Sequence, residues 1–256
     1  MIWMLVLAVI PAQAASIGSP ETQGKGKIAV GIDWSYIFNR DLDYEKSSRP
    51  AGNENYNPKD FKISRGDNTA VKISYGLFDF LDIYAKLGVA NYGLKGDVFA
   101  GDTKTVIENL TARNAFLYGG GLKLAYPLNH GWIIGCDAQF VTSNHKLDFR
   151  SVNLTTEAVS TAQYADCIMQ EWHLAPSIAK KIGRFTPYLG ARYSGFRMNQ
   201  KNPNEPKRWD NLIFSASRNA GVFTGIDWEL AKDFKFNIEG RFVDETAISL
   251  GAAYRF

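Results

Sequence analysis

The chain closes with the decapeptide A-I-S-L-G-A-A-Y-R-F, residues Ala247–Phe256. Every second residue counted back from the end is apolar, whereas the alternate residues are small or charged. A period of two residues predicts a β-strand with one apolar face and one polar face. About ten residues is also the length that a tilted strand needs to cross the hydrocarbon of a bilayer. The stretch therefore predicts a membrane-crossing strand or, as the alternative, an edge strand of a soluble β-sandwich.

The same alternation recurs along the rest of the chain. We predict further strands at 28–38, 69–76, 81–89, 116–126, 132–141, 171–178, 189–194, 219–228 and 236–243. Pro176 interrupts the sixth of these strands, and proline cannot donate a hydrogen bond to a neighbouring strand. We therefore expect a local bulge at Pro176.

Two kinds of connection join the predicted strands. Long polar stretches follow alternate strands, and tight turns lie between the others; the polar stretches are 41–58, 97–111, 148–163 and 199–210. Transmembrane β-barrels have an even number of antiparallel strands, short turns at one end and longer loops at the other. The chain is therefore predicted to be all-β: a single closed antiparallel up-and-down transmembrane β-barrel of about ten strands, with the polar stretches as loops.

Aromatic residues gather beside the predicted tight turns. A soluble sandwich gives no reason for rings to collect at one end of its strands, whereas a membrane barrel carries an aromatic girdle at each interface. This distribution favours the membrane barrel over the sandwich. The predicted interfacial girdle comprises Tyr75, Tyr126, Trp132, Tyr188, Trp228, Phe236, Tyr254 and Phe256.

Charged residues fall on the opposite, inward set of the same strands. Their signs nearly balance, so they can pair across a lumen. The predicted lumen-facing residues are Asp33, Lys72, Asp82, Lys86, Lys123, Asp137, Glu171, Arg192, Asp227, Glu239, Arg241 and Arg255. Small barrels are filled by their own side chains, so ten strands with a charged interior predict a plugged or very narrow lumen.

The first fourteen residues are predicted to be a secretory signal peptide. An apolar run from Ile2 to Ile10 leads to Ala12-Gln13-Ala14, which fits a small-residue cleavage site before Ala15. The run is too short to cross a membrane as a helix. We therefore expect residues 1–14 to be removed on export and residues 15–256 to form the barrel.

The closing strand, which alternates in polarity and ends on the aromatic residue Phe256, resembles the terminal strand of bacterial outer-membrane β-barrel proteins. Over the whole predicted mature chain the architecture is similar to that of porin-like, opacity-protein-like and OmpA-like barrels. The resemblance implies a place in the outer membrane of a Gram-negative cell envelope, the lipid bilayer as partner, and recognition of the terminal strand by the barrel-assembly machinery.

The resemblance also implies a function. It favours a structural or surface-interaction role, such as envelope integrity or adhesion, through long extracellular loops. A narrow passive porin-like channel for ions or small solutes is the alternative.

An outer-membrane hydrolase is a third hypothesis. Barrel enzymes of this kind use Asp pairs with an Asp–His pair, or a His–Ser pair. Here the nearest group is His145 with Asp148, but residues three apart on a strand face opposite sides. With no Asp-x-Asp or His–Ser pair recognised, we expect no catalytic, cofactor-binding or metal-binding residues and no cofactor.

Two remaining features argue against a nucleic-acid partner and against a disulfide. The net charge of +3 is scattered along the chain, which argues against a nucleic-acid partner. The two cysteines fall on neighbouring predicted strands, where the hairpin places Cys136 beside Pro176 and Cys167 beside His145. A disulfide needs Cα atoms within about 7 Å, so none is expected.

Overall fold

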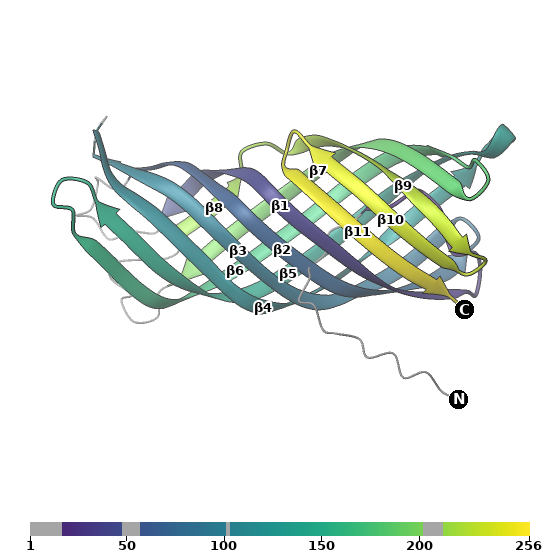
Figure 1. Ribbon diagram of the computed structural model, residues 1–256, viewed down its shortest axis with the longest axis horizontal. Coiled ribbons are helices and arrows are strands. Elements are labelled where there is room, and N and C mark those ends of the chain that lie inside the picture. Colours follow the sequence, from purple (N-terminus) through teal and green to yellow (C-terminus); the bar gives the residue numbers. More distant parts are fainter. Residues whose placement is uncertain (1–16, 48–56, 101–102, 202–211) are drawn as a thin grey trace.

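The computed structural model describes residues 17–47, 57–100, 103–201 and 212–256, and the predicted signal peptide therefore lies outside the described residues (Figure 1). These residues form one closed antiparallel sheet, which confirms the all-β barrel prediction. The strands are β1 (Ile28–Ser47), β2 (Asn57–Phe78), β3 (Leu81–Ala100), β4 (Thr103–Pro127), β5 (Trp132–Asn153), β6 (Val159–Lys180), β7 (Phe185–Lys201), β8 (Leu212–Ala216), β9 (Ala220–Ala231), β10 (Phe234–Phe242) and β11 (Thr246–Arg255). A single 3₁₀ turn, η1 (Asn129–Gly131), joins β4 to β5. Within the described ranges, every helix is too short or too polar to span a membrane.

The barrel changes its strand number along its length. β7 pairs with β9 over Phe185–Tyr193 and with β8 over Arg197–Gln200. β1 likewise changes its partner along its length: it pairs with β11 over Ala29–Asn39 and with β8 over Leu42–Ser47. A ring of ten strands therefore closes through β9, β10 and β11 at the tight-turn end. A ring of eight closes through β8 at the other end, and Figure 1 shows these two closures at opposite ends of the barrel. We call the two ends the ten-stranded half and the eight-stranded half.

The prediction that the long polar stretches are loops was wrong for much of their length. β1 continues to Ser47, β3 and β4 together cover most of 97–111, and β5 and β6 cover most of 148–163. The alternation continues through these segments, but the apolar residues move to the other face. In β3, Leu87 points outward and is exposed, whereas Leu94 points inward and is buried. Residues 154–158 form the turn between β5 and β6, and residues 48–56, 101–102 and 202–210 lie outside the described part of the chain.

The two halves therefore have opposite polarity. In the ten-stranded half, large apolar side chains cover the outside of every strand, and polar side chains fill the inside. An exposed apolar belt around a closed barrel is the surface that faces hydrocarbon in a transmembrane barrel. In the eight-stranded half, a buried apolar cluster fills the inside instead. Its large members are Ile37, Leu42, Phe61, Ile63, Tyr92, Leu94, Leu110, Leu117, Val141, Leu147, Met169, Phe196, Met198, Leu212 and Phe214.

The register of β6 is regular at its proline. Leu174 pairs with Tyr193 and Ser177 pairs with Gly190, so no residue is inserted between them. The expected bulge is absent from this segment, and the ladder to β7 is merely unpaired at Ala175 and Pro176. On the other edge, Cys136 pairs with Pro176 and Cys167 with His145, as predicted, and both thiols are free.

The apolar cluster predicts that Phe214 stabilises the eight-stranded half. Its ring is buried and stacks on Phe61 with ring centres 4.4 Å apart. We expect Phe214→Ala to lower the free energy of unfolding in detergent micelles by about 3–5 kcal/mol, because it leaves a cavity. The matched control is Ile213→Ala, whose side chain is on the outward face of the same strand, and which should cost less than about 1 kcal/mol. Equal losses in the two variants would contradict an apolar core at this level.

Candidate functional site

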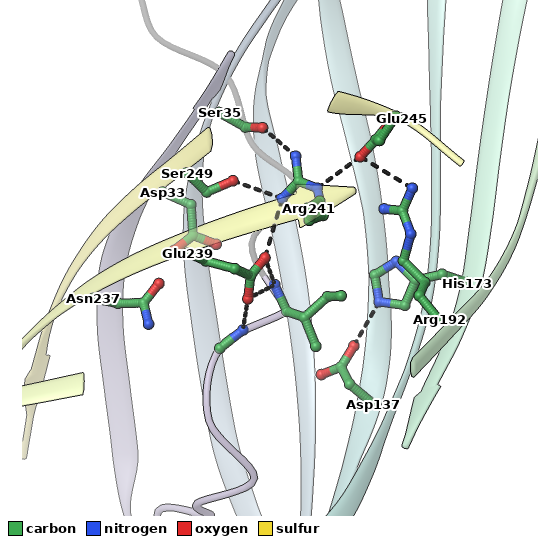
Figure 2. A network of polar contacts seen from close by, with 12 residues as sticks. Asp33, Ser35, Asp137, His173, Arg192, Asn237, Glu239, Arg241, Glu245 and Ser249 are labelled. Atoms are coloured by element: carbon green, nitrogen blue, oxygen red, sulfur yellow. Dashed lines mark hydrogen bonds and ion pairs between the residues drawn. The ribbon is translucent and has the colours of Figure 1, made fainter. Parts of the chain in front are cut away.

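A layer of charged side chains crosses the lumen where the ring narrows from ten strands to eight. Its members come from β1, β6, β7, β10 and the connection between β10 and β11, and Figure 2 shows part of it. We call this group the ionic layer: Arg40, Glu171, Arg192, Glu239, Arg241, Asp244 and Glu245. All seven side chains are almost fully buried.

Arg40 and Arg192 hold one side of the layer together. Arg40 Nη1 lies 3.0 Å from Glu171 Oε1 and 3.3 Å from Glu245 Oε2. Arg192 donates from Nε to Asp244 Oδ2 at 2.9 Å, and its Nη2 lies 3.0 Å from Glu245 Oε1. These contacts join three strands to the β10–β11 connection, so the two arginines tie opposite walls of the lumen to each other.

Arg241 holds the other side. Its Nε lies 2.6 Å from Glu245 Oε1, and its Nη1 lies 3.1 Å from Glu239 Oε1. The same guanidinium donates to Ser249 Oγ at 2.6 Å and to Ser35 Oγ at 2.5 Å, as Figure 2 shows. Buried charges are tolerated when they are paired and their remaining donors are satisfied, and Arg241 meets both conditions.

Apolar side chains close the lumen immediately beyond this layer. The Arg40 guanidinium carbon lies 5.2 Å from the centre of the Phe196 ring, which belongs to the apolar cluster. Phe196 in turn contacts Tyr92 edge-on, with ring centres 6.5 Å apart. Charge and a packed apolar core thus occupy successive levels of the lumen.

The chain before β1 occupies the tight-turn end of the lumen. The backbone N–H groups of Ile17 and Gly18 donate to the Glu239 carboxylate, at 2.9 Å for Gly18. Lys123 Nζ donates to the carbonyls of Ile17 and Ser19 at 2.8 and 2.7 Å. The ionic layer has one carboxylate more than it has guanidinium groups, and these two amides help to satisfy that excess. We call residues 17–23 the N-terminal segment.

Further contacts fix the rest of this segment. Ser19 Oγ donates to Asp227 Oδ2 at 2.5 Å, and the Gln23 N–H donates to Asp82 Oδ2 at 2.9 Å. Glu21 is paired with Lys235; burial alone would raise the pKa of the Glu21 carboxyl, but Lys235 and Lys181 outweigh that effect and lower it. The free space beside the segment is about 100 Å³, which is room for a few water molecules.

A second polar group lies on the wall beside the segment. Asp137 accepts a hydrogen bond from Tyr84 Oη at 2.7 Å, and its carboxylate lies 3.0 Å from His173 Nε2. Lys86 Nζ lies 3.1 Å from Asp33 Oδ2. These residues come from β1, β3, β5 and β6, so hydrogen bonds and ion pairs link the strands of this wall inside the ten-stranded half.

Comparison with known proteins depends on the fold alone. Neither a protein-family model nor a curated protein sequence matches the chain. Among solved structures, the outer membrane protease OmpT from Escherichia coli is similar over 93% of this chain and 100% of its own, at 12% identity and a TM-score of 0.50. The chain has the fold of bacterial outer-membrane β-barrel proteins.

Two further similar structures are also bacterial outer-membrane β-barrel proteins. The translocator domain of the autotransporter NalP from Neisseria meningitidis matches 91% of this chain and 89% of its own, at 11% identity and a TM-score of 0.47. Ail, the attachment invasion locus protein of Yersinia pestis, matches 91% of this chain and 99% of its own, at 9% identity and a TM-score of 0.37.

In this outer-membrane barrel, most of the predicted lumen residues are buried inside. They are Asp33, Asp82, Lys86, Lys123, Asp137, Glu171, Arg192, Asp227, Glu239 and Arg241. Lys72 is half-buried, with Nζ 4.0 Å from the centre of the Tyr84 ring. Arg255 lies at the rim, where Nη2 is 3.6 Å from Asp233.

Three members of the ionic layer were not predicted: Arg40, Asp244 and Glu245. Arg40 follows an irregularity in the pairing of β1 with β11 between Ile37 and Asn39, so simple alternation from Ile28 does not reach it. Asp244 and Glu245 follow the predicted strand 236–243 in the connection to the closing strand, so alternation along a strand does not place them. The connection lies at mid-depth in the barrel because β10 and β11 stop where the ring narrows.

The predicted girdle is placed on the outside with one exception. Exposed rings at the tight-turn end include Tyr75, Tyr126, Trp132, Trp228, Tyr254 and Phe256, and Phe236 is half-buried. Tyr188 was assigned to the girdle wrongly: it is 3% exposed, and its hydroxyl donates to Glu239 Oε2 at 3.0 Å. Tyr188 has the same inward phase as Arg192, four residues later on β7, and alternation therefore directs it into the lumen.

The structure also contains a Ser–His pair, which was not predicted from the sequence. Ser143 Oγ lies 2.8 Å from His145 Nε2, and His145 Nδ1 lies 2.8 Å from the Arg113 carbonyl. Both side chains point inward and are at most 3% exposed. Asp148 points outward and instead accepts from Arg113, so it does not orient His145. Both side chains of the Ser–His pair are buried among the described residues of the eight-stranded half.

The ionic layer predicts a large cost for removing one of its cations. Arg241→Ala removes the guanidinium that pairs with Glu239 and one of the three that approach Glu245, so the buried layer loses a positive charge. We expect the free energy of unfolding in detergent to fall by about 3–5 kcal/mol. The control is Arg255→Ala, which removes a partly exposed rim pair and should cost less than about 1 kcal/mol. A loss for Arg241→Ala as small as that of the control would show that the layer does not stabilise the barrel.

Proposed function

We propose that this protein is a sealed outer-membrane barrel with a structural or surface-interaction role in the cell envelope. The observation that supports the proposal is the closure of the lumen at two successive levels, by the ionic layer and then by the apolar cluster. A conducting pore needs a continuous aqueous path lined by available polar groups. The charged groups of the ionic layer are instead bonded to one another, and the next level is apolar.

The eight-stranded half suits a role at the cell surface. The belt of the ten-stranded half is enough to cross the bilayer, so the eight-stranded half extends beyond it. Its outward face carries polar and charged side chains, including the pairs Lys104–Asp97 at 2.6 Å and Arg113–Asp148 at 2.5 Å. Its continuous strands and apolar core make this half rigid. Binding residues are often carried by loops that such a rigid scaffold positions.

Single-channel recording in planar bilayers tests the sealed lumen. We expect the purified protein to insert without producing discrete conductance steps. Sizeable ion-selective steps would contradict the proposal. If those steps also changed selectivity in Lys86→Glu or Arg192→Glu, the narrow-channel alternative would take its place.

Cysteine labelling in intact cells tests which half faces outward. Thr156 is exposed in the turn between β5 and β6, and Leu128 is exposed in the opposite turn between β4 and β5. We expect a membrane-impermeant maleimide to label Thr156→Cys in intact cells and Leu128→Cys only after the outer membrane is permeabilised. The unsubstituted chain is the control for Cys136 and Cys167. Labelling with the opposite sidedness would reject the proposed orientation.

A further inference from the structure

A hollow of about 830 Å³ indents the outer wall of the ten-stranded half, within the apolar belt. Its lining is almost wholly apolar and comes from β4, β5, β6, β7 and β9. Its lining includes the short side chains of Cys136, Pro176 and Ala191, which we call the floor, and the longer side chains of Leu124 and Val222. A concave apolar site of this volume lies within the range of small-molecule binding pockets.

The sequence produces the hollow through register. Cys136 pairs with Pro176, and the regular register between β6 and β7 sets Pro176 opposite Ala191. Three neighbouring strands therefore present short outward side chains at the same level. Their next neighbours in that row are Leu124 on β4 and Val222 on β9, which are long and exposed. The large side chains of Ile134, Ile178 and Leu189 form the margin toward the tight turns.

Basic side chains lie beyond that margin. Lys180 is on the outward face of β6, two residues past Ile178, and its Nζ lies 5.0 Å from the Trp132 ring centre while donating to the His130 carbonyl. Arg184, in the turn between β6 and β7, is exposed and makes no ion pair within the described part of the chain. Lys181 in the same turn is already paired with Glu229 at 2.8 Å. Lys180 and Arg184 thus offer positive charge at the interface below the hollow.

We propose that the hollow binds one phospholipid of the periplasm-facing leaflet, with an acyl chain over Pro176 and the phosphate at Lys180 and Arg184. The hollow supplies apolar volume at the depth of the acyl chains, and the cations stand at the depth of the headgroups. Arginine and lysine near an interface bind lipid phosphate through charge-assisted hydrogen bonds. This site rests on the proposed orientation, with the tight turns toward the periplasm, and it is independent of whether the lumen conducts.

A second copy of the chain fits the hollow less well. A two-fold dimer sets the same patch of each subunit against itself, so the concave floor would face another concave floor and leave a void. Association within lipid relies on close packing, which a void removes. A flexible acyl chain can fill the concavity completely.

Alkylation of Cys136 tests the proposal. Cys136 is part of the floor, whereas Cys167 is buried inside the barrel, and peptide mass mapping distinguishes the two. We expect added phosphatidylglycerol in detergent micelles to slow alkylation of Cys136 by a small lipid-soluble maleimide at least tenfold, with saturation. Inorganic phosphate alone should not slow it. Native mass spectrometry of the same sample should show one retained phospholipid per chain.

Matched variants separate the hollow from the belt as a whole. Ala191→Leu fills the floor and should abolish retention of the phospholipid, whereas Ala252→Leu, on the outward face of β11, should leave retention unchanged. Replacing Lys180 and Arg184 together by glutamine should weaken protection of Cys136 at least fivefold. Protection that persists in Ala191→Leu, or that appears only together with a dimer, would overturn the proposal, as would the absence of any saturable protection.

Discussion

One carboxylate, that of Glu245, is shared by three guanidinium groups from three different strands. Arg40, Arg192 and Arg241 approach it to 3.3, 3.0 and 2.6 Å. Of these strands, β1 and β7 run through both halves of the barrel, whereas β10 belongs to the ten-stranded half alone. A barrel must close at every level because unpaired edges are not tolerated in lipid. The β10–β11 hairpin therefore has to end inside the wall at a fixed depth. Ionic contacts made by the residue at its tip are a physical means of fixing that depth.

The two halves rely on different forces, and the ionic layer marks the boundary between them. Around the ten-stranded half the surroundings are hydrocarbon, so apolar surface gains little by being buried and the interior is organised by charge. The eight-stranded half, which we propose extends beyond the bilayer, would be surrounded by water, and there the ordinary hydrophobic effect packs Phe61, Phe214 and their neighbours inside. The same strands run through both halves without interruption. What changes along each strand is which alternate set of residues is apolar.

This switch of the apolar face explains why the sequence predicted the ten-stranded half of the barrel but not the eight-stranded half. The period of two in Ala247–Phe256 and its counterparts was sufficient for the barrel, and hairpin geometry was sufficient to pair Cys136 with Pro176. The eight-stranded half was missed because a segment whose outward residues are polar resembles a loop unless the inward set is followed as well, as from Leu87 to Leu94 in β3. The ionic layer was recovered only in part. Alternation gives the face of Arg192, but it cannot place Glu245, whose position depends on how β8 closes the ring.

Because side chains and the N-terminal segment fill the lumen, the interior of the barrel offers little room for a ligand. The N-terminal segment, the ionic layer and the apolar cluster occupy the interior in succession, and Ser143 and His145 are buried there as well. Among the described residues, the surfaces left for recognition are the outward wall of the eight-stranded half and the lipid-facing wall of the ten-stranded half. On that second wall large side chains alternate with shorter ones such as Ala85, Gly120 and Ala138, and a lipid chain can lie across them. At Cys136, Pro176 and Ala191 the wall recedes, and there the same forces that hold any chain against the belt can hold one chain in a defined place.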